Sequence, residues 1–286
     1  MATQIHPTAI VSSEAQLGAN VAIGPYSVIE DGVVLGDDCQ LGCRVVIKRR
    51  TTLGVGNEVG DGAVLGGKPQ HAKVSNDYGG VQIGDRNCFR ENTTVHAAME
   101  SGKLTIIGSN NLLMVNAHVG HDVVVGSHAI IVNNVMLGGH VIVEDRAYLG
   151  GAVAVHQFCR IGTLAMIGGQ ARIVQDVPPY VTVDGATNRV VGLNRIGLRR
   201  SGVADEQMLQ LKEAYRIMYR YGLTWPEAIA ELTRNYPTGP AARLAPFLLE
   251  GRRGYVPERR VPRGVTLRLP DDLPGDENDK QLRRFG

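Results

Sequence analysis

Five of the eight histidines in this 286-residue chain fall within one short stretch: His118, His121, His128, His140 and His156. Imidazole is the side chain best suited to proton transfer near neutral pH, because its unperturbed pKa is close to 6.5. Asp122 directly follows His121, and a carboxylate beside an imidazole can orient it or stabilise its protonated form. Several neutral imidazoles that converge on one point are also a ligand set for zinc. The residue types therefore leave two chemistries open, a general base and a metal centre.

A regular repeat surrounds these histidines. In one register of six, from Val11 to Ile173, 25 of 28 positions are apolar, and the exceptions are His71, Asp77 and Ser101. A period of six fits neither an α-helix nor a half-buried strand, which repeat at 3.6 and 2 residues. One short strand and its turn can use six residues, so the repeat predicts a parallel β-helix. Glycine follows many of the repeat positions, and this indicates that the chain turns a corner of the β-helix there.

A different pattern follows the repeat. Two adjacent prolines, Pro178 and Pro179, end the strand pattern, because proline cannot donate to a strand ladder. Apolar spacing and end signals then predict helices over 203–221, 224–235 and 241–250, with a capping box between Thr224 and Glu227. From Pro257 onward the chain is rich in proline and charge, and we expect this tail to be poorly ordered or to lie against a surface.

Three segments carry a specific resemblance: NLLMVNAHVGHDVVVG (111–126), AVHQFCRIG (154–162) and QDVPPYV (175–181). Together they resemble the UDP-N-acetylglucosamine 3-O-acyltransferases, a family of hexapeptide-repeat enzymes in lipid A biosynthesis. The resemblance extends over about residues 5–250. It implies a mostly β fold, a left-handed parallel β-helix of triangular section over residues 1–185. A small helical C-terminal domain over 186–255 and the charged tail over 256–286 would follow.

A triangular coil of three six-residue units places residues that are three units apart above one another. Four histidines then line one edge of three consecutive coils: His118, His121, His140 and His156. His128 falls on a neighbouring face. Two insertions, at 66–80 and 97–103, interrupt the repeat without changing its phase. Because Ser101 precedes Val119 by one full coil, we expect the second insertion to lie beneath the histidine edge.

The resemblance also implies a reaction. An (R)-3-hydroxyacyl group would pass from acyl carrier protein to the 3-hydroxyl of UDP-N-acetylglucosamine, with no metal and no cofactor. His121 would be the general base and Asp122 its partner. The backbone N–H of Gly139, one coil above His121, would stabilise the oxyanion. Contact between His121 and Asp122 requires a bend, because neighbouring strand residues point to opposite sides.

Further positions match the family's substrate contacts: Lys73, His118, His140, His156, Gln157, Gly169, Asn194 and Arg200. Asn194 and Arg200 would lie near the nucleotide, and Gly169 would limit the length of the acyl chain. Basic residues of the helical domain could attract the acidic acyl carrier protein: Arg195, Arg199, Arg200, Lys212, Arg216 and Arg220. The family is trimeric, so we expect a homotrimer with sites at subunit boundaries, and which subunit supplies each residue stays open.

Two departures from the family pattern leave the acceptor open. This chain has His71 and Ile196 where the family commonly has acidic residues near the sugar nucleotide. A 3-amino sugar analogue, which would give an amide, is therefore an alternative acceptor. A related N-acyltransferase carries an extra N-terminal domain, whereas this repeat begins by residue 11. A zinc-dependent hexapeptide-repeat enzyme or a purely structural β-helix is a more distant alternative.

Composition and the N-terminal sequence indicate in which compartment the protein functions. The formal net charge is +2, and no apolar stretch is long enough to span a membrane. The N-terminus lacks a charged segment followed by an apolar one, so no secretory signal is expected. Of the four cysteines, Cys39 and Cys159 fall at inward positions of the repeat, as buried reduced thiols would. We expect a cytoplasmic protein with no transmembrane segment and no nucleic-acid partner.

Overall fold

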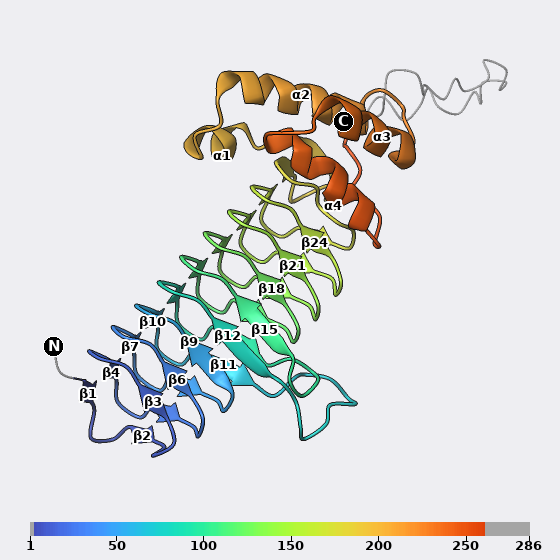
Figure 1. The fold of residues 1–286 in the computed structure, drawn as a ribbon. Helices are drawn as coiled ribbons and strands as arrows, with labels where there is room; N and C mark the ends of the chain where they lie inside the picture. The colour runs from blue at the N-terminus through green and yellow to red at the C-terminus, as the bar shows by residue number, and fades with distance from the viewer. Residues whose placement is uncertain (1–2, 261–286) are drawn as a thin grey trace, which may run out of the picture.

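Short parallel strands wind into a long prism with three sheets in the computed structural model, which describes residues 3–260 (Figure 1). The chain visits sheets A, B and C in turn, and each strand pairs with strands in the coils on either side of it. A helical domain covers the C-terminal end of the prism (Figure 1). The prediction of a left-handed parallel β-helix followed by a small helical part is confirmed.

Most strands contain only two residues, of which the second points inward. Sheet A contains β1 (Gln4–Ile5), β4 (Ala22–Ile23), β7 (Gln40–Leu41), β10 (Glu58–Val59), β13 (Cys88–Phe89), β16 (Leu112–Leu113), β19 (Ile130–Ile131), β22 (Tyr148–Leu149), β25 (Met166–Ile167), β27 (Val181–Val183) and β28 (Val190–Leu193). Sheet B contains β2 (Ile10–Val11), β5 (Val28–Ile29), β8 (Val46–Ile47), β11 (Val64–Gly67), β14 (Thr94–His96), β17 (His118–Val119), β20 (Met136–Leu137), β23 (Ala154–Val155) and β26 (Arg172–Ile173). Sheet C contains β3 (Gln16–Leu17), β6 (Val34–Leu35), β9 (Thr51–Leu53), β12 (Gly80–Ile83), β15 (Leu104–Ile107), β18 (Val124–Val125), β21 (Ile142–Val143) and β24 (Arg160–Ile161).

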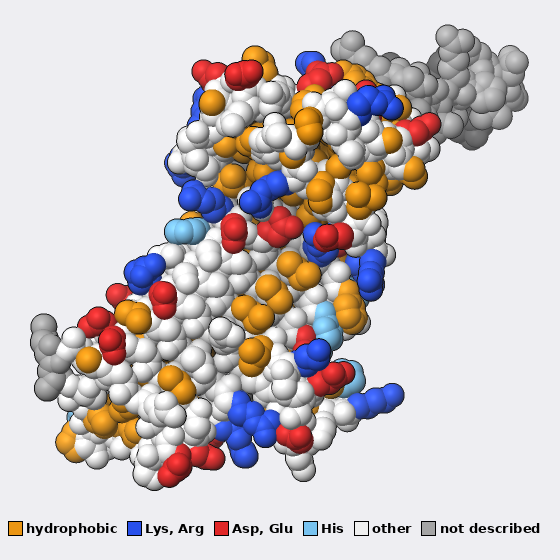
Figure 2. Space-filling model, in the orientation of Figure 1, with side chains coloured by type: hydrophobic (Ala, Val, Ile, Leu, Met, Phe, Trp, Pro, Cys, Tyr) orange, Lys and Arg blue, Asp and Glu red, His pale blue; other side chains and the backbone are white. Residues whose placement is uncertain are grey.

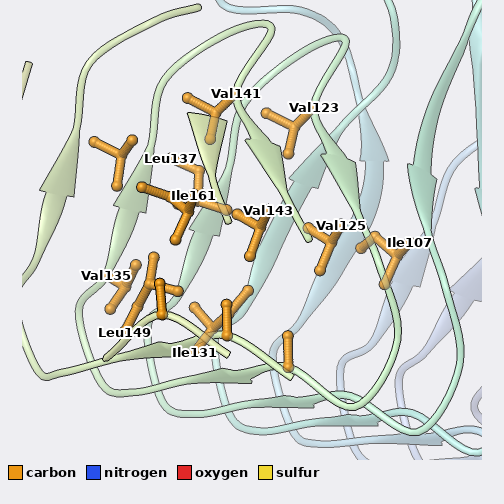
Figure 3. Packing of buried hydrophobic residues seen from close by; sticks show 14 of the residues in the cluster. Ile107, Val123, Val125, Ile131, Val135, Leu137, Val141, Val143, Leu149 and Ile161 are labelled. Carbon is orange, nitrogen blue, oxygen red and sulfur yellow. The ribbon is translucent and has the colours of Figure 1, made fainter. Parts of the chain in front are cut away.

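The inward residues form one continuous apolar column. Val119 pairs with Leu137 and Leu137 with Val155, so the predicted coil of three repeat units is present. Figure 3 shows how inward residues of successive coils, among them Val123 and Val141, stack along the interior. Both are fully buried, and burial of such side chains contributes roughly 1.5–3 kcal/mol each.

The corners combine two different backbone requirements. Asn116, Asp122 and His140 have φ near +60°, so most left-handed corner positions are filled by residues other than glycine, although Gly56 and Gly62 fill two of them. Other corner glycines are needed for a different reason, the close stacking of successive coils. A Cβ on Gly36 would lie 2.6 Å from the carbonyl oxygen of Gly54 in the next coil.

The two insertions lengthen their coils by whole repeat units. Leu65 pairs with Val95, and Val95 pairs with Val119. The first of these coils therefore contains two repeat units more than a regular coil, and the second contains one more. Whole units explain why the phase of the repeat survives. Val95 and not Ser101 lies beneath Val119, so the place predicted for Ser101 was wrong. The second insertion does lie at the histidine edge, as expected, since Met99 N–H donates to Asp122 Oδ2.

The C-terminal part begins with an antiparallel hairpin. Strand β28 pairs antiparallel with β27, and the chain then forms α1 (Arg195–Arg200), α2 (Asp205–Tyr219), α3 (Trp225–Asn235), η1 (Pro240–Arg243) and α4 (Leu244–Glu250). The predicted helices correspond to α2, α3 and the η1–α4 pair, whereas α1 was not predicted. The Thr224–Glu227 capping box is present, since Thr224 N–H donates to Glu227 Oε2 at 2.8 Å.

The first residues of the predicted tail lie against the protein. Val256 and Glu258 are buried, and Glu258 accepts a hydrogen bond from the Tyr215 hydroxyl at 2.6 Å. The rest of that tail, 261–286, lies outside the described residues. Within 3–260, no helix is long and apolar enough to cross a membrane. Cys39 and Cys159 are buried free thiols, and burial raises the pKa of Cys159 to about 11.

Candidate active site

A cavity of about 400 Å³ lies along the edge where sheet B turns toward sheet C. Its wall contains five histidines together with corner glycines and Gln157: Gln70, His71, His96, His118, Gly120, His121, Gly138, Gly139, His156, Gln157 and Arg172 are among the lining residues. The edge thus collects polar groups from successive coils. We call this space the histidine cleft.

His121 and Asp122 form a hydrogen-bonded pair in this cleft. Nδ1 of His121 lies 2.8 Å from Oδ2 of Asp122, and the side chains are only 13% and 15% exposed. The expected bend is present at Asp122, whose φ is +58°. The backbone N–H of Met99, in the second insertion, also donates to Asp122 Oδ2 at 3.1 Å. This arrangement holds Asp122 in place and leaves Nε2 of His121 available for a ligand.

Gly139 lies directly against the imidazole of His121. A Cβ at this position would fall 2.5 Å from Cε1 and 2.6 Å from Nε2 of His121, so only glycine fits there. The neighbouring N–H groups of Gly138 and His140 donate to backbone carbonyls, whereas that of Gly139 has no partner among the described residues. An unpaired N–H beside a candidate base is the arrangement that an oxyanion site requires.

His140 is the third member of this group. Its Nε2 lies 3.8 Å from Oδ2 of Asp122, and its ring stacks on Phe158 with centroids 4.6 Å apart. Ligand atoms of His121, Asp122 and His140 lie within 4.8 Å of one another, the one such group within 3–260. These three residues are therefore the ones that could hold a metal ion.

His118 and His96 form a half-buried pair in the histidine cleft. Their ring centroids are 5.2 Å apart; His118 Nδ1 contacts Thr94 Oγ1 at 2.9 Å, and His96 Nδ1 contacts the Lys68 carbonyl at 2.6 Å. Burial lowers the pKa of both imidazoles, so both are neutral at neutral pH. His96 was not predicted. His96 follows Val95 in the repeat, just as His156 follows Val155. Its place on the same edge as His156 can be recognised only when the second insertion is counted as one extra repeat unit.

The first insertion reaches the cleft through residues other than the predicted lysine. His71 lies near His121, with ring centroids 6.0 Å apart, and Gln70 also lines the cleft. Lys73 is exposed and does not line it. The departure at His71 therefore falls next to the candidate base.

Asn194 and Arg200 line a second cavity, of about 950 Å³, together with His128 and the outer face of sheet A. Asn194 caps α1: its Oδ1 accepts from Gly197 N–H at 3.0 Å, and its Nδ2 donates to the Leu164 carbonyl at 2.9 Å. Gly169 follows β25, so it lies at the corner between sheets A and B. Within one chain, none of these three residues meets His121.

Comparisons with known proteins agree on one family. A family model described as UDP-N-acetylglucosamine O-acyltransferase, domain 2, matches residues 176–256, and one for bacterial transferase hexapeptide repeats matches residues 104–139. The chain is 44% identical over 254 residues to the acyl-[acyl-carrier-protein]–UDP-N-acetylglucosamine O-acyltransferase of Anaeromyxobacter dehalogenans, covering 88% of this chain and 99% of the relative.

Solved structures agree as well. The Francisella novicida UDP-N-acetylglucosamine acyltransferase superposes with a TM-score of 0.88 at 34% identity, covering 91% of this chain and 97% of that one. The UDP-N-acetylglucosamine O-acyltransferase of Moraxella catarrhalis gives a TM-score of 0.85 at 38% identity, with coverage of 88% and 99%.

Proposed function

This chain belongs to the family of acyl-[acyl-carrier-protein]–UDP-N-acetylglucosamine O-acyltransferases, and we propose that it performs the acyl transfer in the histidine cleft with His121 as general base. The observation that carries the proposal is the contact of His121 with Asp122 on one side and Gly139 on the other. The substrates are a 3-hydroxyacyl thioester of acyl carrier protein and UDP-N-acetylglucosamine.

The reaction starts with a proton transfer. Nε2 of His121 takes the proton from the sugar's 3-hydroxyl while the oxygen attacks the thioester carbonyl. The carboxylate of Asp122 stabilises the imidazolium that forms. The negative charge that develops on the carbonyl oxygen is stabilised by the N–H of Gly139. Collapse of the tetrahedral intermediate breaks the carbon–sulfur bond, and the imidazolium returns its proton to the departing thiolate of acyl carrier protein.

Other residues of the cleft bind rather than react. His118, His140, His156 and Gln157 surround the sugar and the start of the acyl chain in this proposal. His118 serves there as a neutral imidazole, consistent with its lowered pKa and its contact to Thr94. Lys73 is exposed in the first insertion, from which it could reach a bound ligand.

Asn194, Arg200 and Gly169 can join the site only if a second chain supplies them. We propose a homotrimer in which the histidine cleft of one chain faces the second cavity of its neighbour. Apolar side chains at both places support this packing: Met136 and Phe158 beside the cleft are 48% and 51% exposed, and Tyr148 at the second cavity is 36% exposed. Arg199 and Arg200 would then bring positive charge to the nucleotide phosphates.

The helical domain offers a surface for acyl carrier protein. Basic side chains gather where this domain meets the prism (Figure 2), and Arg195, Lys212 and Arg216 line a small cavity there. Arg220 lines the same cavity, where it also pairs with the buried Glu258. An acidic carrier protein would be attracted to this surface, and salt would weaken the attraction. We place the enzyme in the cytoplasm, which suits its free thiols.

The acceptor is tested by product analysis. The purified enzyme is offered UDP-N-acetylglucosamine or its 3-amino analogue with acyl carrier protein thioesters of different chain lengths, and products are identified by mass. We expect an ester on the 3-hydroxyl. His71 lies beside His121 where the family commonly has an acidic residue, so the 3-amino sugar is the second candidate. Amide formation with no ester would overturn the oxygen acceptor.

The same assay separates base catalysis from a metal mechanism. If His121 acts as a general base without a metal, the enzyme should keep its rate of acyl transfer after treatment with a chelator. Stoichiometric zinc that is required for activity would assign His121, Asp122 and His140 to a metal centre instead.

A further inference from the structure

The last described segment of the chain returns from the helical domain to the histidine cleft. Asp176 N–H donates to the Gly254 carbonyl at 2.8 Å, and Val256 N–H donates to the Asp176 carbonyl at 3.0 Å. These bonds, with a bridge between Asp176 and Tyr255, fix the backbone directly after Arg253. This segment is therefore held beside the coil that carries His156.

The buried carboxylate of Asp176 favours a position of the Arg253 side chain close to it. The carboxylate of Asp176 is fully buried, and its Oδ2 has no hydrogen-bond partner among the described residues. Burial raises the pKa of Asp176, while a hydrogen bond from the Arg160 backbone and the charges of Arg160 and Arg253 oppose that rise. Positive charge near this carboxylate lowers the cost of burying it, which gives Arg253 a reason to remain there.

Two contacts of His156 favour opposite tautomers. Nδ1 of His156 lies 3.0 Å from Nη2 of Arg253 and 3.1 Å from the carbonyl oxygen of Gln157. A guanidinium can only donate, so the first contact requires an unprotonated Nδ1. A carbonyl oxygen can only accept, so the second requires a proton on Nδ1. A charged donor makes the stronger hydrogen bond, and Arg253 therefore decides the tautomer.

We propose that Arg253 is a positioning residue that holds His156 in the Nε2–H tautomer, so that His156 presents a hydrogen-bond donor to substrate in the histidine cleft. Without Arg253, the Gln157 carbonyl would draw the proton to Nδ1 and leave an acceptor at Nε2. The inference rests on the proposed function, in which His156 contacts substrate.

A double-mutant cycle tests this role through kcat/KM for acyl transfer. Arg253→Ala is expected to lower kcat/KM roughly ten-fold, the effect of one misplaced hydrogen bond. The matched control is Arg252→Ala, which removes an exposed neighbouring arginine and should leave kcat/KM unchanged. Arg253→Lys keeps a cationic donor and should retain most of the activity. In a His156→Ala background, Arg253→Ala should cost nothing further, because it acts through the missing imidazole.

Additive losses in the cycle would overturn the inference, since Arg253 would then act independently of His156. A His156→Ala variant with wild-type kcat/KM would overturn it as well. If Arg253→Ala does not assemble, Arg253→Met keeps the aliphatic stem, and the same cycle is measured with it. His121→Ala is included as a reference. Activity that survives His121→Ala contradicts the proposed function, whereas additivity between Arg253 and His156 contradicts only the tautomer role.

Discussion

His121 has one ring nitrogen held by Asp122, and its ring lies so close to Gly139 that a Cβ there would fall 2.6 Å from the other nitrogen, Nε2. The pair comes from adjacent residues, and the positive φ of Asp122 lets both side chains lie on one side of the chain. Fixing the imidazole through Nδ1 orients Nε2 before substrate binds, which lowers the cost of reaching the reactive geometry.

In the histidine cleft, the half-buried His96–His118 pair predicts how stability depends on pH. Burial lowers the pKa of both imidazoles below the value near 6.5 that histidine has in an unfolded chain. Between the folded and unfolded pKa values the unfolded chain binds more protons. The contribution of these histidines to the free energy of unfolding is therefore fully present above about pH 6.5, and it is lost as the pH drops below that value.

His118→Gln should reduce this dependence. The thermal midpoint of the wild-type protein should fall between about pH 7 and pH 5, and that of the variant should fall less. His6→Gln, at an exposed position near the N-terminus, serves as the control and should behave like the wild type. Equal pH dependence of the His118 variant and the wild type would contradict the pKa shift of His118.

Among the elements, the corners between sheets B and C do most to shape the site. Stacking of successive coils places Gly139 over His121, and the Met99 N–H of the second insertion supports Asp122. The coil geometry thus brings together groups that are far apart along the chain.

Gly139→Ala tests this stacking. Its Cβ would lie 2.5 Å from Cε1 of His121, so the ring must move, and we expect kcat to fall roughly 10²-fold or more. Gly151→Ala is the matched corner control, because its Cβ would meet nothing closer than 3.6 Å. The two variants should have similar thermal midpoints. A Gly139→Ala enzyme as active as Gly151→Ala would contradict the placement of His121 against Gly139.

The repeat in the sequence predicted the stacking of coils correctly where it is uninterrupted. At the two insertions, the predicted stacking was less accurate. The six-residue period and the resemblance together placed Gly139 above His121, because register in a β-helix follows directly from counting. They misplaced Ser101 and missed His96, because the number of residues that an insertion adds to a coil is not visible in the period. Helix α1 was also missed: its six residues are too short to show an apolar period, and Asn194 caps it through a side-chain bond to Gly197.

At the scale of the whole molecule, one chain holds only part of the proposed site. The histidine cleft and the cavity that contains Asn194 and Arg200 lie on different parts of the prism. A closed trimer would repeat the same contact three times and bring these two parts together at each boundary.

Subunit mixing tests the shared site. His121→Ala and Arg200→Ala should each lose activity when expressed alone. When the two variants are co-expressed, some boundaries combine an intact His121 with an intact Arg200 from the neighbour. Random assembly should restore about a quarter of the wild-type activity. The same mixture without any recovery would contradict a site shared between chains.

In the proposed mechanism, His121 removes the proton from the sugar hydroxyl. Single-turnover transfer from a 3-hydroxyacyl carrier protein to UDP-N-acetylglucosamine by His121→Ala tests it directly, with His6→Ala as the matched histidine control. Loss of a general base should slow the chemical step by roughly 10²- to 10⁴-fold, while the control keeps the wild-type rate. A His121→Ala enzyme that transfers the acyl group at close to the wild-type rate would rule out His121 as the general base.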